Sequence, residues 1–170
     1  MKLNSLVPVM VASVAIFSAG HAAASIVNID AGSSAGTSLA LSAGDHLVSW
    51  IGVADGGSYD AWSAWSSGDN WLNAILVTTG SGQTGYGTGV YPWYATPGDA
   101  LAAAQSLTFH MVLANAETVN FMVADNIFGD NRGGVSLSVT AVPLPAALPL
   151  ALSGFGLLGF AASRRKNATV

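Results

Sequence analysis

The sequence predicts an all-β fold, a jelly-roll-like β-sandwich with one short helix, flanked by an apolar segment at each end. Two observations indicate the sandwich: short apolar runs recur between clusters of Gly, Ser, Asn and Asp, and the last run alternates apolar with small polar residues. Such alternation is typical of a strand with one buried face. The expected strands are residues 25–29, 38–41, 46–53, 73–78, 106–113, 118–124 and 134–142.

One segment departs from the strand pattern and predicts a helix after Thr96. Thr96 is a residue type that caps helices, Pro97 suits the first helical position, and Asp99 is placed to complete a capping box. The chain has no cysteine, so apolar burial, with or without a metal, must stabilise the domain.

Residues 1–24 have the pattern of a secretory signal peptide that signal peptidase removes. Lys2 supplies the positive start, residues 3–19 are apolar, and three small residues, Ala22 to Ala24, complete a cleavage site. The alternative is a retained membrane anchor. We expect cleavage after Ala24, which exports the rest of the chain.

The charges of the 170-residue chain exclude a nucleic-acid partner. Four of its five Lys and Arg residues lie in the first ten or last seven positions. Between these ends lie all nine acidic residues and one basic residue, Arg132. A phosphate backbone would be repelled by this stretch.

Residues 25–141 are long enough for one domain, and we expect no enzyme there. The stretch has no cysteine nucleophile and no Gly-x-Ser-x-Gly motif, and its two histidines, His46 and His110, lie in strand-like runs. A glycine-rich turn at residues 85–89 lacks the lysine of a phosphate loop. Three carboxylates leave glycoside hydrolysis open as a less favoured alternative. They are Asp55, Asp60 and Asp69.

The C-terminal end predicts a membrane span with a basic stop. Residues 146–163 carry no charge and are just long enough to cross a bilayer. A basic cluster follows and places the preceding domain outside the cytoplasm, with residues 167–170 as a cytoplasmic tail. The cluster consists of Arg164, Arg165 and Lys166.

A proline-containing motif stands immediately before this span, and its prolines keep the backbone extended. It consists of Val142, Pro143, Leu144, Pro145 and Ala146. This motif, the span and the basic cluster together resemble the VPLPA variant of the bacterial PEP-CTERM sorting signal, over residues 142–166. The resemblance implies that an exosortase in the inner membrane cleaves near the motif, in a bacterium that makes extracellular polysaccharide. The periplasm-facing protein would then reach the cell surface or matrix. The alternative is a permanent single-pass anchor.

The segment between the last two expected strands concentrates oxygen donors within seven residues. It offers two carboxylates and two amide carbonyls, from Asp125, Asn126, Asp130 and Asn131. Calcium prefers six to eight such ligands in flexible geometry. The alternative is a turn in which these side chains bond their own backbone.

The order of several segments resembles that of calcium-dependent galactose-binding lectins with a jelly-roll fold. Three segments carry the resemblance. They are the acidic loop, which contains Asp125 to Asn131 before the final strand, the Gly-Ser-Tyr at residues 57–59, and the aromatic segment at residues 91–93, which is matched to a strand. It implies a bound Ca²⁺ whose ligands are the main-chain oxygen of Tyr59 and the side chains of Asp125, Asp130 and Asn131.

All five tryptophans lie within 44 residues, and part of this stretch is too polar for a strand. Exposed aromatic rings stack on the apolar faces of sugars, which makes Trp62 and Trp65 candidate glycan contacts. The alternative is that they cover an end of the sandwich.

The favoured function is therefore an exosortase-processed surface or matrix protein with a calcium-dependent glycan-binding domain. The main alternative is a structural matrix protein with an architectural metal or none.

Overall fold

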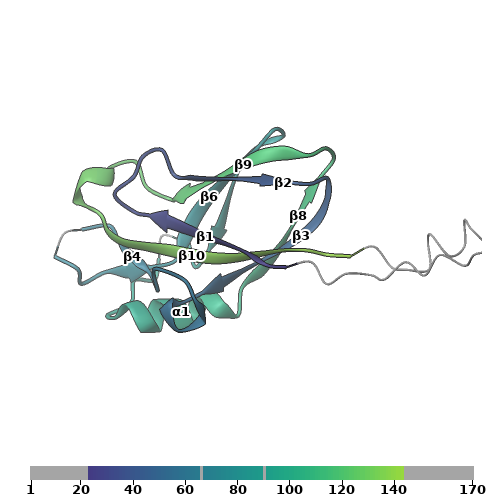
Figure 1. Ribbon diagram of the computed structural model, residues 1–170. Coiled ribbons are helices and arrows are strands. Elements are labelled where there is room, and N and C mark those ends of the chain that lie inside the picture. The colour runs from purple at the N-terminus through teal and green to yellow at the C-terminus, as the bar shows by residue number, and fades with distance from the viewer. Residues whose placement is uncertain (1–22, 66, 90, 144–170) are drawn as a thin grey trace, which may run out of the picture. The chain divides into compact units, whose positions relative to one another are not determined.

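Two antiparallel β-sheets pack face to face in the computed structural model, which describes residues 23–65, 67–89 and 91–143 (Figure 1). The larger sheet contains β1 (Ser25–Asp30), β3 (Gly44–Ile51), β4 (Trp62–Ser63), β5 (Trp71–Leu72), β8 (Thr108–Leu113) and β10 (Arg132–Ala141). The smaller sheet contains β2 (Thr37–Leu41), β6 (Ala74–Thr79), β7 (Gly82–Gly87) and β9 (Glu117–Val123). The predicted β-sandwich is confirmed, and its jelly-roll connectivity stays a prediction.

The strand β10 is the centre of the larger sheet and pairs with three others. It pairs with β1, with β3 over its second half and with β4 at its first two residues. Its alternating sequence explains this position, because Val135, Leu137 and Val139 all point into the core. On the opposite face Ser136 is also buried, since the loop containing Tyr59 covers it.

The smaller sheet has the order β2-β9-β6-β7. Thr79 pairs with Gly82, so β6 and β7 form a hairpin with a two-residue turn. The sequence predicts only a glycine-rich turn at residues 85–89, and the structure corrects this, because most of that segment belongs to β7. As an exposed edge strand, β7 has no apolar run to reveal it, and its pairing with β6 determines its conformation.

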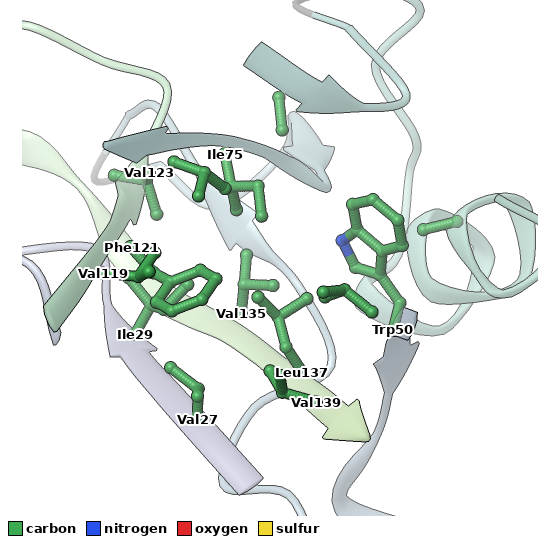
Figure 2. Close-up of a cluster of buried hydrophobic side chains, with 14 of the residues drawn as sticks. Val27, Ile29, Trp50, Ile75, Val119, Phe121, Val123, Val135, Leu137 and Val139 are labelled. Atoms are coloured by element: carbon green, nitrogen blue, oxygen red, sulfur yellow. The ribbon is translucent and has the colours of Figure 1, made fainter. Parts of the chain in front are cut away.

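The core lies between the two sheets and takes side chains from both. Phe121 and Val119 of β9 meet Ile29 of β1 and the inward side chains of β10 (Figure 2). Trp50 of β3 contributes a large ring that contacts Phe109 of β8 edge to face. This continuous cluster accounts for the apolar runs of the sequence.

The helix α1 (Pro97–Gln105) begins where the sequence predicts. The Oγ1 of Thr96 accepts a hydrogen bond from the backbone N–H of Asp99 at 3.1 Å and donates one to the Asp99 carboxylate at 2.7 Å. Ala100 and Ala104 are buried, and the helix packs beside β3 and β5. Two short 3₁₀ turns, η1 (Val53–Asp55) and η2 (Phe128–Asp130), complete the fold.

The two ends of β10 place the two functional segments at opposite ends of the larger sheet. The acidic loop leads into Arg132, while Ala141 leads into the proline-containing motif. Ten residues of strand span about 33 Å. No helix within the described ranges has the length and apolar content needed to cross a membrane. The expected span at residues 146–163 and the signal peptide up to residue 22 lie outside those ranges.

Candidate functional site

The loop between β9 and β10 begins as a turn stabilised by Asp125. Its Oδ1 accepts hydrogen bonds from the backbone N–H groups of Asn126 at 2.6 Å and Ile127 at 3.3 Å. A turn in which side chains bond their own backbone was the alternative to a calcium site. Asp125 forms such a turn with one of its carboxylate oxygens. Asn126 itself is exposed, and the 3₁₀ turn η2 follows.

The second half of the loop is fixed to the end of β1. The Nδ2 of Asn131 donates a hydrogen bond to the carbonyl oxygen of Ala31 at 3.1 Å, and the N–H of Ala31 donates to the carbonyl of Gly133 at 3.1 Å. Because a carbonyl only accepts, the first bond identifies which side-chain atom of Asn131 is nitrogen. Its Oδ1 therefore points away from Ala31.

Two side-chain oxygens of this loop are buried without a hydrogen-bond partner. They are the Oδ1 atoms of Asp130 and Asn131, which are consecutive in the chain. Elsewhere in the described residues, a side-chain nitrogen of His46, the indole nitrogen of Trp50 and the Oδ1 of Asn73 are also buried without a hydrogen-bond partner. A buried polar atom without a partner costs about 1–3 kcal/mol, so two adjacent ones require an explanation.

Tyr59 lies beside the first residues of β10. Its backbone N–H donates to the Oγ of Ser136 at 2.9 Å, and Ser136 in turn donates to the Oδ1 of Asn28 at 2.8 Å. The Tyr59 ring packs against the Cα of Gly134, where a Cβ would lie 2.6 Å from the ring. The structure thus brings Tyr59 next to a residue that follows the acidic loop by three positions.

Gly133, the second residue of β10, has a φ of +73°. A side chain there would meet the carbonyl of Ala61 and, at 3.1 Å, the ring of Trp71. Glycine allows β10 to turn here and still pair with β4. This pairing keeps the acidic loop close to the segment that follows β4 and contains Trp65. In the described part of the chain, no three His, Cys, Asp or Glu side chains gather as a metal site. Any ion at this loop would thus depend on amide and main-chain oxygens as well.

Two of the three candidate carboxylates for glycoside hydrolysis accept backbone hydrogen bonds at the turn η1. The N–H of Gly52 donates to the Asp55 carboxylate at 3.4 Å, and the N–H of Val53 donates to that of Asp60 at 2.8 Å. Asp69 is exposed in the segment after β4. These bonds give Asp55 and Asp60 a local structural role.

The two candidate glycan contacts have different environments. Trp62 is only 1% exposed, and its indole N–H donates to the carbonyl of Ala74 at 3.0 Å. It is therefore a core side chain, and the expectation that it contacts a glycan is wrong. Its apolar ring and bonded N–H fit the interior. Trp65 is 41% exposed and remains available.

The structure also shows two exposed aromatic residues in the segment 91–93, for which the sequence predicts a strand. Tyr91 and Trp93 lie in an irregular segment, and only the next residue, Tyr94, pairs, with Trp71. The ring of Trp93 lies 4.6 Å from that of Trp65 and 4.9 Å from that of Tyr91, measured between centroids. The proline between the two residues and the nearby glycines are the sequence signals against a strand.

The sheet ends where the proline-containing motif begins. The backbone N–H of Val142 donates to the carbonyl of Asp45 at 2.8 Å, and Pro143 has no N–H with which to continue the sheet.

The profile of the PEP-CTERM protein-sorting motif matches residues 141–166. The chain carries a PEP-CTERM sorting motif. Neither a search of curated proteins nor one of solved structures finds a match, and the resemblance to lectins stays a prediction.

The PEP-CTERM motif implies an exported protein with a membrane-anchored sorting signal before processing, and it implies an exosortase as the processing partner. The match includes Val142 and Pro143, which the structure describes. The remaining residues of the motif and the basic cluster lie outside the described residues. These are Leu144, Pro145, Ala146, Arg164, Arg165 and Lys166.

Proposed function

We propose that this exported protein binds Ca²⁺ through the loop between β9 and β10 and acts as a glycan-binding protein of the cell surface or matrix. The observation that carries the proposal is the pair of buried, unpartnered oxygens on Asp130 and Asn131. A bound cation would give both atoms a partner, and oxygen is the ligand that Ca²⁺ prefers.

The donor set fits a hard cation. Asp130 supplies a carboxylate oxygen, and the orientation of Asn131 makes its unpartnered atom an oxygen rather than an N–H. Asp125 adds a second carboxylate, and the main-chain oxygen of Tyr59 completes the proposed ligands. When bound, the ion would supply coordination to hydroxyl groups of a sugar.

The charge of the domain favours cation binding. All nine acidic residues of the chain lie in the described part, together with a single basic residue, Arg132. The resulting negative potential raises the local concentration of divalent cations. Arg132 is the one Lys or Arg side chain in these described ranges.

Calcium is expected to raise the thermal midpoint of the full chain, purified in detergent, relative to the chain in chelator. An ion that binds only the folded state stabilises it by about 2.7 kcal/mol at one hundred times its dissociation constant. For a domain of this size, that stabilisation raises the midpoint by several degrees. Scanning calorimetry with millimolar CaCl₂ and with EDTA measures the difference.

Two variants identify the site of this effect. Asp130→Ala is expected to abolish the calcium-dependent shift, whereas Asp45→Ala removes a carboxylate at the other end of the sheet and should retain it. A shift that persists in Asp130→Ala would place the ion elsewhere. The absence of any shift in the unmodified chain would reject the calcium site.

A purely architectural metal is the second candidate, and the burial of the two oxygens favours it. An ion held by buried atoms stabilises the loop whether or not a sugar reaches it. A glycan array with and without calcium separates the two functions. Calcium-dependent stability without calcium-dependent glycan binding would support the architectural role.

A further inference from the structure

Three exposed aromatic side chains from two separate segments form one cluster at the end of the larger sheet that holds β4 and β5. Trp65 is 41% exposed, Tyr91 is 68% exposed and Trp93 is 38% exposed. We refer to these three residues as the aromatic platform. The planes of Trp65 and Trp93 stand at 80°, and those of Tyr91 and Trp93 at 37°. Trp65 and Trp93 therefore meet edge to face, and all three rings leave aromatic surface exposed.

The backbone on both sides of the platform is fixed by hydrogen bonds. Trp71 of β5 and Tyr94 exchange two backbone bonds, each of 2.9 Å, which position the segment containing Trp93. On the other side, the carbonyl of Trp65 accepts bonds from the N–H of Gly68 at 3.1 Å and from the Oγ of Ser63 at 3.0 Å. Because the backbone next to Trp65 and Trp93 is already ordered, little backbone ordering entropy is lost there on binding.

The composition of the platform favours a sugar over an aliphatic ligand. One face of a pyranose ring consists of C–H groups whose hydrogens are slightly positive, and the face of an aromatic ring is negative. Trp and Tyr also carry a polar N–H or O–H at the rim that can bond to hydroxyl groups. Two rings at 80° can contact both the face and the edge of one sugar.

Charge selects among polysaccharides. The described residues contain nine acidic side chains and one basic side chain, Arg132, whose guanidinium lies beside Gly68. This negative potential repels a polymer of acidic sugars. Binding of a neutral polysaccharide carries no such electrostatic cost, and the exposed rings allow the polysaccharide to pass across them.

We propose that the aromatic platform of Trp65, Tyr91 and Trp93 stacks on the pyranose rings of a neutral polysaccharide chain. This proposal rests on the proposed glycan-binding function and names its ligand class, but it does not require the calcium ion. The platform and the acidic loop lie near each other, since β4 pairs with the first residues of β10.

Affinity electrophoresis of the full chain in detergent tests the proposal with three neutral probes, hydroxyethylcellulose, β-galactan and dextran, and with alginate as the anionic probe. At least one neutral probe should retard the chain, and alginate should not. Tyr91→Ala and Trp65→Ala should each weaken the retarding interaction about tenfold, since Trp and Tyr dominate contacts of this kind. Val112→Ala serves as the control, because Val112 is 75% exposed on β8, at the other edge of the sheet.

Every gel is run with calcium and with EDTA, and light scattering records the mass of each variant. Retardation in EDTA that the two aromatic variants lose supports the platform even if calcium does not bind. Calcium-dependent stability with no retardation by any neutral probe would overturn the platform and leave the metal site intact. A dimer that Tyr91→Ala dissociates, with no polysaccharide binding, would instead make the platform an interface between two copies.

Discussion

Replacing Phe121 by alanine is expected to lower the free energy of unfolding by about 3–5 kcal/mol. Phe121 is fully buried at the centre of the core and contacts both sheets, as Figure 2 shows. Removing its ring leaves a cavity that neighbouring β-branched side chains cannot fill, because their rotamers are restricted. Urea denaturation of the full chain in detergent, followed by tryptophan fluorescence, measures the change.

Met122→Ala is the matched control for this prediction. Met122 is the next residue of β9, is only half-buried and points to the opposite face of the sheet. Its replacement should cost clearly less than that of Phe121. A loss of stability below about 1 kcal/mol in Phe121→Ala would contradict the two-sheet core.

Deleting residues 142–146 is expected to abolish processing in a cell that contains an exosortase. The deletion removes Pro143, which has no N–H with which to continue the sheet, together with the rest of the recognised motif. Mass spectrometry of the recovered chain distinguishes the full-length form from the cleaved form. The wild-type chain should be cleaved only where the exosortase is present.

Two further variants separate recognition from folding. Pro143→Ala keeps Val142 and its hydrogen bond to Asp45 but alters the motif, so its cleavage should slow. Thr140→Ala changes the last part of β10 and leaves the motif intact, so its cleavage should be normal. Normal cleavage of the deletion variant would show that the exosortase recognises another segment.

The elements with local signals were predicted correctly from the sequence. The alternation from residue 134 onward identified β10, and the capping residues identified α1 to the residue at its start. The strands β4, β5 and β7 were missed, because their partners rather than their own sequences determine them. Two-residue strands such as β4 carry no periodicity at all.

The candidate site shows the same division. The loop with Asp130 and Asn131 was predicted as a candidate metal site because its oxygen donors are close in the sequence. Which of those oxygens lack partners depends on Ala31, one hundred residues away from Asn131, and so could not be predicted. The aromatic platform likewise depends on a contact between Trp65 and Trp93, and one of the two expected tryptophans, Trp62, is in the core.

A crystal structure of the protein grown with calcium tests the central claim most directly. The account predicts an anomalous difference peak at roughly 2.3–2.6 Å from the Oδ1 atoms of both Asp130 and Asn131, the usual range for Ca²⁺ ligands. The peak should disappear when crystals are soaked in EDTA. Density showing these two oxygens bonded to water or to protein donors, with no ion between them, would contradict the calcium site.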